Sequence, residues 1–242
     1  MTAQVAIRGL RKNFGGLAAL KGIDLDIEGG QLVGLIGPNG SGKTTLLNIV
    51  SGYYDASAGD IRFDGNAIRG KPPSTLARHG IGRSFQLTKV FRRLSVLENM
   101  LVSSLVDWRV SRHSARERAM ASLADLGLAQ LAGERAGNLS GGQAKLLEFG
   151  RIMMLAPKLV LLDEPFSGVH PDLKRFMYEK IGKWNAGGVT IVLVSHDMGS
   201  IFGICGRVVT LSDGRIIADG LPEAVRNDPA VLEAYLGDHY EA

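Results

Sequence analysis

Eight consecutive residues constrain the fold of this chain more than any other stretch. They are Gly37-Pro38-Asn39-Gly40-Ser41-Gly42-Lys43-Thr44, followed by Thr45, and they match the spacing G-x-x-x-x-G-K-[ST]. In this P-loop pattern, glycines let backbone N–H groups converge on phosphate oxygens, the lysine neutralises the β- and γ-phosphates, and the threonine hydroxyl holds Mg²⁺. Residues 31–36 and 44–50 read as the buried strand and the helix that must flank such a loop. The sequence therefore predicts a nucleotide-phosphate site at a strand-to-helix turn.

A second apolar run, at residues 158–165, ends in two carboxylates, Asp163 and Glu164, before a proline. Such a run is typical of a fully buried parallel strand, and α/β folds bind ligands at the C-terminal ends of these strands. We expect Asp163 to serve Mg²⁺ through a water molecule. Glu164 is expected to act as the base, or as the group that polarises an attacking water.

A third buried strand is predicted at residues 189–194, and His196 follows it. A single histidine is usually structural, but this one falls at the same sheet edge as Lys43 and Glu164, where it is placed to contact a γ-phosphate. Gln86 follows a strand predicted at residues 81–85. Its amide can coordinate a metal ion or orient water, although most glutamines are only polar surface.

Phe14 precedes Gly15 and Gly16, in a stretch that predicts a loop between strands at residues 5–10 and 23–27. A loop position leaves the ring free to stack on a flat ligand such as adenine. The alternative is that the ring forms an edge of the core. The residues alone favour this second interpretation.

The chain shows helix signals and no strand candidate from about residue 95 to residue 156. Three segments there have the form of a capping box, which opens a helix: Ser95 with Glu98, Ser114 with Glu117, and Ser140 with Gln143. The third lies in Leu139-Ser140-Gly141-Gly142-Gln143, whose small residues leave backbone N–H groups bare, so that a second anion site at a helix N-terminus is expected. The pattern predicts a helical insertion into an α/β domain.

Length and composition fit one α/β domain with a subdomain, because 242 residues with 45% hydrophobic content can bury a large core. A single cysteine, Cys205, excludes an intrachain disulfide. We find no signal-peptide pattern and no apolar run of about 18 residues, so we expect any membrane role to depend on a partner. The excess of basic residues is concentrated in one stretch, because seven basic residues and no acidic one lie between Asp64 and Glu98. That run suits an acidic partner, anionic lipid or nucleic acid, or is simply a solvated face.

The order of these motifs resembles the nucleotide-binding subunits of ABC transporters over essentially the whole chain. The motifs are the P-loop, Gln86, the LSGGQ segment at 139–143, the acidic pair Asp163 and Glu164, and His196. The resemblance implies a P-loop NTPase (RecA-like) core with an antiparallel β subdomain and an inserted α-helical subdomain, all within one ATP-binding domain. It places the core at residues 1–86 and 157–226, the helical subdomain at 87–156 and a C-terminal tail at 227–242.

The resemblance also implies roles and partners. Phe14 would stack on adenine, and Gln86 would be linked to metal and water and face the membrane subunits. The LSGGQ segment would contact ATP of a second protomer, in an ATP-dependent homodimer or heterodimer. ATP and Mg²⁺ are the implied ligands, and two permease subunits and a solute-binding protein are the implied partners, at the cytoplasmic face of the inner membrane. One departure is His170, which stands where many relatives carry Asp.

Three stretches are similar to the branched-chain amino acid uptake group, which also includes urea and amide importers. They are Phe14-Gly15-Gly16-Leu17-Ala18-Ala19-Leu20, Gly168-Val169-His170-Pro171 and Glu233-Ala234-Tyr235-Leu236-Gly237. That group often has Asn where this chain has His170. Membership would explain the basic run, which brackets the Gln86 loop where membrane subunits dock.

Two other functions compete with transport. A soluble ABC ATPase acting on nucleic acid or the ribosome would use the basic run as a binding patch, but such proteins usually carry long coiled-coil insertions or two linked nucleotide domains, for which 242 residues leave no room. A GTP switch or a small-molecule kinase would leave the LSGGQ segment unexplained, and the chain has no N-K-x-D guanine motif. We therefore expect a transport ATPase that does not bind nucleic acid.

Overall fold

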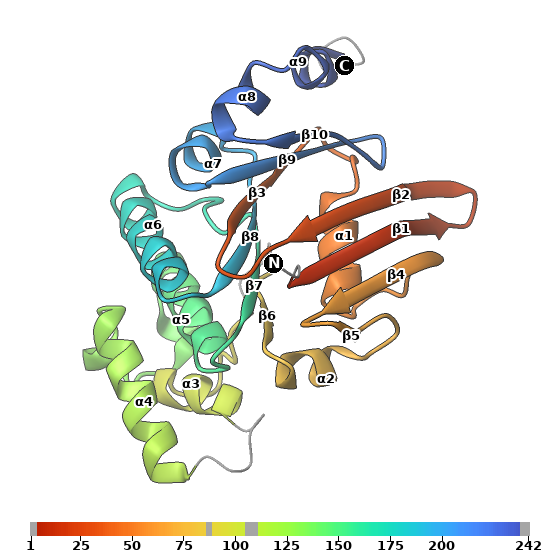
Figure 1. The fold of residues 1–242 in the computed structure, drawn as a ribbon. Helices are drawn as coiled ribbons and strands as arrows, with labels where there is room; N and C mark the ends of the chain where they lie inside the picture. The colour runs from red at the N-terminus through yellow and green to blue at the C-terminus, as the bar shows by residue number, and fades with distance from the viewer. Residues whose placement is uncertain (1–3, 86–88, 105–110, 238–242) are drawn as a thin grey trace.

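The computed structural model describes residues 4–85, 89–104 and 111–237. Within them, a larger sheet has the strand order β10-β9-β3-β8-β7-β6 and a smaller sheet has the order β2-β1-β4-β5 (Figure 1). The larger sheet contains β3 (Leu32–Ile36), β6 (Ile81–Arg83), β7 (Leu159–Asp163), β8 (Thr190–Val194), β9 (Arg207–Ser212) and β10 (Arg215–Gly220). The smaller sheet contains β1 (Val5–Phe14), β2 (Leu17–Ile27), β4 (Ala58–Phe63) and β5 (Asn66–Ala67).

The helices lie between and around these sheets (Figure 1). They are α1 (Lys43–Val50), α2 (Pro73–Arg78), α3 (Val96–Ser104), α4 (Arg112–Asp125), α5 (Gly141–Met153), α6 (Pro171–Ala186), α7 (Met198–Ile204), α8 (Pro222–Arg226) and α9 (Pro229–Gly237), with 3-10 turns at Ala129–Leu131 and Ala136–Asn138. In the part of the chain that the structure describes, no helix has the length and apolar character needed to span a bilayer.

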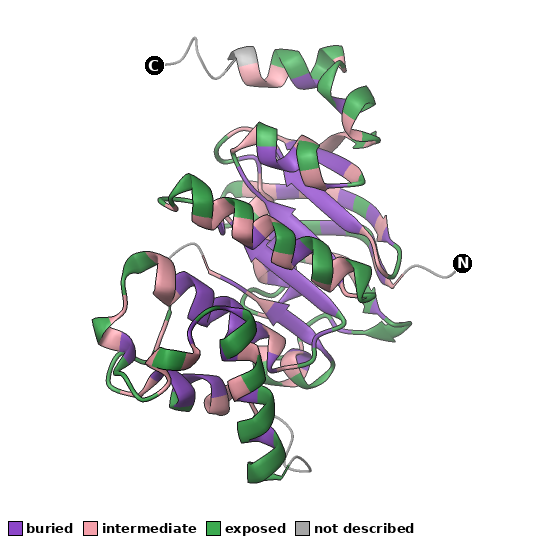
Figure 2. Ribbon diagram, turned by 90° about the vertical axis from the view of Figure 1, so that its left-hand side faces the viewer, coloured by how far each residue is buried: buried purple, intermediate pink, exposed green. Residues whose placement is uncertain are grey.

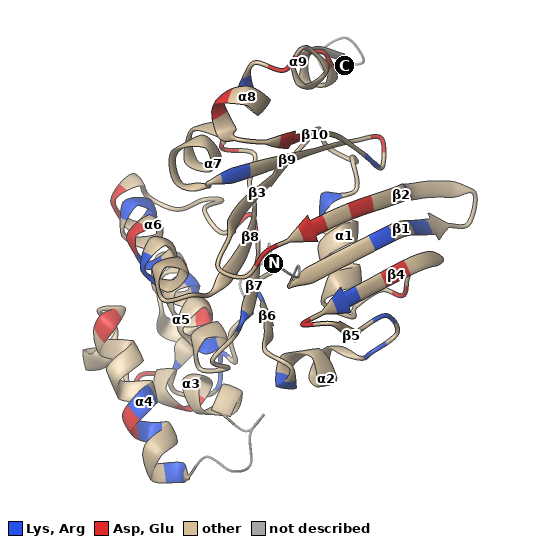
Figure 3. Cartoon of the chain, viewed as in Figure 1, with Lys and Arg blue, Asp and Glu red and all other residues tan. Residues whose placement is uncertain are grey.

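The larger sheet is parallel except at one edge, where β10 returns antiparallel to β9. Every residue of β3, β7 and β8 is buried, as the purple strands in Figure 2 show. Charged residues lie along the outer elements, and β3 and β8 carry none (Figure 3). The three predicted buried strands are therefore confirmed. Because parallel strands end at the same sheet edge, the segments that follow β3, β7 and β8 are brought together there.

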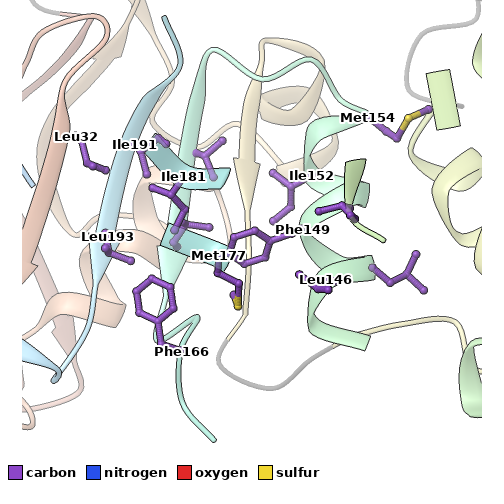
Figure 4. Packing of buried hydrophobic residues seen from close by; sticks show 14 of the residues in the cluster. Leu32, Leu146, Phe149, Ile152, Met154, Phe166, Met177, Ile181, Ile191 and Leu193 are labelled. Carbon is purple, nitrogen blue, oxygen red and sulfur yellow. The ribbon is translucent and has the colours of Figure 1, made fainter. Parts of the chain in front are cut away.

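Side chains alternate between two cores along each central strand. In β3, Leu32 joins the core shared with α5 and α6, whereas Val33 joins the core shared with α1 and the smaller sheet. Figure 4 shows the first of these cores, to which Phe149 of α5, Ile181 of α6 and Ile191 of β8 contribute. The sheet is thus covered on both faces, as its uniformly apolar strands require.

The helical insertion consists of α3, α4 and α5 (Figure 1). The first predicted capping box is confirmed: Glu98 N–H donates to Ser95 Oγ at 3.1 Å, and Ser95 N–H donates to Glu98 Oε2 at 2.7 Å. The prediction that Ser114 opens a helix is wrong. Helix α4 begins at Arg112, and Ser114 N–H donates to Oγ of the capping residue Ser111 at 3.1 Å. A second serine three residues earlier is thus the helix cap.

The hairpin of β1 and β2 is longer than the sequence predicts. Phe14 is the last residue of β1 and pairs with Leu17, so the prediction that Phe14 lies in a loop outside the strands is wrong. The end of β1 is largely exposed and therefore lacks the apolar alternation that marks residues 5–10 as a strand. The Phe14 ring is nevertheless accessible, with 42% of the residue exposed.

Candidate functional site

The P-loop joins β3 to α1 and borders an open cleft of about 650 Å³. Helix α1 begins after Gly42, whose φ of 108° lies in the left-handed region, and no side chain caps this helix start. A side chain at position 42 would place Cβ 2.8 Å from the carbonyl oxygen of Ala19, so the turn requires glycine. The cleft is lined by Asn39, Gly40, Gly42, Lys43, Thr44, Thr45, Asp163, Glu164 and Val194.

The Lys43 ammonium is held over the loop itself. Its Nζ donates to the carbonyl oxygens of Gly37 and Pro38, each at 2.7 Å, and to Ser41 Oγ at 3.3 Å. These partners keep the charge beside the cleft. Phosphate oxygens, which carry more negative charge than carbonyls, are stronger acceptors for the same ammonium.

Thr44 and Asp163 bring two oxygen donors together at the cleft. Thr44 Oγ1 lies 3.5 Å from Asp163 Oδ1. Mg²⁺ binds hydroxyl and carboxylate oxygens at about 2.0–2.1 Å in octahedral geometry, so this pair fits a site in which Thr44 binds the ion and Asp163 holds it through a water molecule. Asp163 is buried, and its second oxygen is occupied by Arg83, whose Nη2 lies 3.2 Å from Oδ2. The carboxylate therefore keeps one oxygen directed to the cleft.

Arg83 is a site residue that the sequence interpretation missed, because it was counted in the basic run. It is an interior group: its side chain is only 6% exposed, and Nη1 donates to Asn48 Oδ1 at 2.6 Å and Ser51 Oγ at 2.7 Å, both in or directly after α1. Burial lowers the pKa of its guanidinium, while the charge of Asp163 opposes that shift. Its position at the C-terminal end of β6, beside the acidic strand β7, is the signal that could have identified it.

Glu164 and His196 meet across the ends of β7 and β8. His196 Nδ1 lies 2.8 Å from Glu164 Oε2, and the Glu164 side chain is 14% exposed against 77% for His196. The Glu164 backbone has a φ of 48°, in the left-handed region, and its N–H donates to the carbonyl of Val194 at 2.9 Å. This backbone conformation turns the carboxylate toward the cleft that Lys43 also lines.

The LSGGQ segment forms the start of α5. Gln143 N–H donates to Ser140 Oγ at 3.3 Å, and Ser140 N–H donates to Gln143 Oε1 at 2.9 Å, which confirms this capping box. A Cβ at Gly141 would meet nothing within 4 Å, whereas one at Gly142 would lie 2.4 Å from Leu173 Cδ2. None of the segment, from Leu139 on, lines the P-loop cleft of the same chain.

Lys145 connects this helix to the acidic turn and was also missed by the sequence interpretation. It is buried in α5, and its Nζ donates to the carbonyl oxygens of Pro165 at 3.1 Å and Glu164 at 3.4 Å. Burial lowers the pKa of its ammonium, and the charges of Glu148 and Glu164 oppose that shift. Lys145 thus links α5, the helix that begins in the LSGGQ segment, to the turn that carries Glu164.

The remaining predicted residues lie elsewhere. Gln86 falls outside the described residues. Phe14 packs edge-on against Tyr54 with ring centroids 5.4 Å apart, and Lys12 Nζ lies 4.9 Å from its ring centroid. His170 caps α6, with its Nδ1 accepting from the backbone N–H of Asp172 at 3.4 Å.

Comparisons with known proteins agree with this geometry. A family model described as "ABC transporter" matches residues 20–167, and one described as "Branched-chain amino acid ATP-binding cassette transporter" matches residues 215–241. The high-affinity branched-chain amino acid transport ATP-binding protein BraF of Pseudomonas aeruginosa is 37% identical over 250 residues, covering 96% of this chain and 97% of the relative.

Solved structures are similar over nearly the full length. The ADP conformation of MJ1267, an ATP-binding cassette of an ABC transporter, has a TM-score of 0.89 at 32% identity and covers 98% of this chain and 100% of that one. A dimeric post-hydrolysis state of the cassette MJ0796, bound to ADP and Pi, has a TM-score of 0.82 at 26% identity over 90% of this chain and 98% of that one. The chain therefore has the P-loop NTPase fold predicted from its motifs.

Proposed function

Because the chain belongs to the ABC transporter family of ATP-binding proteins, we propose that it hydrolyses ATP to power solute uptake through separate membrane permease subunits. One observation carries the assignment of its site. The P-loop, Asp163 and Glu164 line one cleft, and His196, from a third segment of the sequence, contacts Glu164. Phosphate binding, metal binding and water activation are thus combined within reach of one nucleotide.

In the proposed reaction, a water oxygen forms a bond to the γ-phosphorus, and the bond from that phosphorus to the bridging oxygen of ADP breaks. The N–H groups of the uncapped start of α1 and the Lys43 ammonium stabilise the phosphate charge. Glu164 orients the water and accepts its proton, and His196 holds the Glu164 carboxylate and approaches the γ-phosphate. Phe14 stacks on the adenine from the end of β1.

We propose that Thr44, Asp163 and Gln86 hold the Mg²⁺ that accompanies ATP. The ion neutralises charge that develops on the phosphate oxygens. Arg83 contributes by holding Asp163 against α1, so that Oδ1 stays directed at Thr44.

The LSGGQ segment is proposed to act on the ATP of a second protomer, in a homodimer or a heterodimer. Its residues are not among those that line the P-loop cleft of the same chain, and the space around Gly141 is open. A related cassette is dimeric in a structure with ADP and Pi. In such a dimer the start of α5 would contact the γ-phosphate of the ATP bound to the partner. Because Lys145 of α5 bonds the carbonyl oxygens of Glu164 and Pro165, a movement of α5 on binding that phosphate would also move the turn that carries Glu164.

A groove of about 740 Å³, lined among others by Phe85 and Lys89, is the proposed docking site for one of the two permease subunits, and the second subunit would dock on the second protomer. Lys89 and Phe91 of the basic run line it together with Arg151 of α5, whose guanidinium carbon lies 4.7 Å from the Phe91 ring centroid. Aromatic and arginine side chains are enriched where proteins bind partner segments. Docking there would place the chain, as a peripheral subunit, at the cytoplasmic face of the inner membrane.

We propose branched-chain amino acids, or a related small polar solute, as the cargo, delivered by a solute-binding protein. The names of the relatives and the match over residues 215–241 support this choice.

For domain organisation, we propose one ATP-binding domain with its core at residues 1–86 and 157–226, a helical subdomain at 87–156 and a tail at 227–242.

Replacing Glu164 with Gln tests the hydrolytic assignment. Glu164→Gln keeps the phosphate contacts but removes the charge that polarises water, so ATP should bind at least as tightly while hydrolysis slows by about 100-fold or more. Binding and steady-state phosphate release are measured on the purified chain with Mg²⁺. An unchanged melting temperature is the control, and a variant with normal hydrolysis contradicts the assignment.

The cargo is tested in cells that carry the chain with its permeases. Uptake of labelled leucine should fall to background when Glu164→Gln replaces the wild-type chain, whereas uptake of labelled urea should not change. Loss of urea uptake with normal leucine uptake would assign the chain to the related urea importers instead.

A further inference from the structure

The C-terminal helix α9 reaches the P-loop through one side chain. The backbone N–H of Gly37 donates to the hydroxyl oxygen of Tyr235 at 2.7 Å, although 198 residues separate the two positions. Tyr235 is half-buried and packs against the core that contains α5 and α6. In Figure 1, α9 follows α8 beside the β9–β10 edge of the larger sheet, so the contact joins the end of the chain to the nucleotide loop.

Gly37 is confined on its other sides as well. Its φ is +144°, and a Cβ there would lie 1.9 Å from the carbonyl oxygen of Leu211 in β9. Its own carbonyl accepts from Lys43 Nζ at 2.7 Å. The Gly37 backbone is therefore held by Tyr235 through its N–H and by Lys43 through its C=O.

The hydroxyl of Tyr235 contacts the backbone of the loop at Gly37, and neither residue is among those that line the phosphate cleft. The orientation of the P-loop N–H groups depends on where the loop leaves β3, and Gly37 is the first residue after that strand. A hydrogen bond at this point restricts the rotation of the whole turn.

We propose that Tyr235 is a positioning residue for the P-loop, and that α9 thereby forms part of the nucleotide-responsive structure. The inference rests on the proposed ATP site and deepens it. It gives a role to the Glu233-Ala234-Tyr235-Leu236-Gly237 ending, which the catalytic assignment leaves unused. Because coupling between two parts of a protein is reciprocal, ATP must stabilise the docked position of α9 by as much as that position favours ATP.

The variant Tyr235→Phe removes the hydroxyl and keeps the ring that packs on the core. Loss of the hydrogen bond from Gly37 should weaken ATP binding by about two- to tenfold, because the Gly37 N–H loses its acceptor and the loop gains freedom. Binding of ATP and ADP is measured on the full purified chain, alongside kcat and KM. We expect a raised KM, a nearly unchanged kcat and an unchanged melting temperature without nucleotide. Leu232→Ala, at an exposed position of the same helix, is the matched control and should bind ATP like wild type.

Amide hydrogen exchange of the wild-type chain supplies a second readout that needs no variant. Addition of ATP should slow exchange of the amides of α9, and the slowing should disappear in Tyr235→Phe. No change of exchange in wild-type α9 overturns the inference.

Equal ATP affinity of wild type and Tyr235→Phe also overturns the inference that Tyr235 positions the P-loop. If the affinity is equal and the melting temperature of the variant is lowered, the contact is purely structural. Absence of ATP binding by the wild-type chain would overturn the proposed function and this inference together. Normal ATP binding that Tyr235→Phe leaves unchanged would overturn the inference alone.

Discussion

The starts of α1 and α5 solve the same physical problem in opposite ways. Every helix leaves about four backbone N–H groups without intrahelical partners at its N-terminus. At α1 the residue before the helix is Gly42 in a left-handed conformation, and no side chain caps the helix. At α5, Ser140 and Gln143 bond each other's backbone N–H groups in a complete capping box.

From this difference we infer that the start of α1, and not that of α5, depends on a ligand. The open end of α1 faces a polar cleft and lies beside Lys43, so we expect phosphate oxygens to supply the acceptors that this helix start lacks. The start of α5 has a cap of its own, which pairs the N–H groups of Ser140 and Gln143, and we expect it to fold without a ligand. A nucleotide of a second protomer then adds a contact there but does not complete the helix.

The sharpest test of this comparison pairs Lys43→Ala with Ser140→Arg. Lys43→Ala should weaken ATP binding by about 10- to 150-fold, because a charge-assisted contact to phosphate is lost in the chain's own site. Ser140→Arg should leave that site intact but block approach of the second protomer, so that a folded monomer binds ATP without dimerising or hydrolysing it. Sizing with and without ATP in a Glu164→Gln background, together with ATP titration, measures both effects.

Each variant of this pair is the control for the other. If Ser140→Arg still forms an ATP-dependent dimer, the proposal that the LSGGQ segment contacts the ATP of a second protomer is contradicted. Loss of ATP binding by monomeric Ser140→Arg would show that both helix starts serve the same nucleotide.

Glycine-to-alanine substitutions compare the backbones of the two helix starts. Gly42→Ala forces a Cβ into contacts of 2.7 Å with Leu20 Cδ2 and 2.8 Å with Ala19 O, at a left-handed φ. We expect its free energy of unfolding to fall by about 2–4 kcal/mol. Gly141→Ala meets open space and should change that free energy by less than about 1 kcal/mol, in the stabilising direction. Urea unfolding of the nucleotide-free chain measures both, and equal losses would show that the two starts do not differ in backbone demand.

The smallest expected effect is that of the cap itself. Ser140→Ala removes the side chain that accepts from Gln143 N–H and should lower the free energy of unfolding by about 1 kcal/mol. ATP binding to the monomer should not change, because the P-loop cleft does not include this residue. A larger loss, or one that ATP reverses in the monomer, would mean that the helix start is not satisfied within one chain. Urea titration with and without ATP distinguishes these outcomes.

The fold and the centre of the site were predictable where the determinants are local. The P-loop is one continuous segment, and Glu164 and His196 directly follow short buried strands whose sequence identifies them. Parallel strands place their C-terminal ends at one sheet edge, which is why residues 32 positions apart are found 2.8 Å from each other.

Residues that depend on register were not predictable in this way. Arg83 belongs to a run of basic residues in sequence, but it becomes an interior partner of Asp163 because β6 pairs beside β7. Lys145 reaches the carbonyl of Pro165 because α5 packs over the sheet at a particular rotation. Phe14 was placed in a loop because an exposed strand carries no apolar alternation. The contacts of Arg83 and Lys145 depend on how secondary-structure elements pair and pack, which the local sequence does not specify.

The strand order of the larger sheet also determines when the chain can complete its fold during synthesis. Strand β3 ends at Ile36, but its two neighbours in the sheet, β8 and β9, begin at Thr190 and Arg207. At about 5–20 residues per second, a ribosome needs roughly 8–30 s to produce the segment between β3 and β8. Throughout this interval an apolar strand with unpaired backbone groups is outside the ribosome, in a form that invites pairing with other chains. The nascent protein is therefore exposed to intermolecular strand pairing until β8 and β9 have emerged.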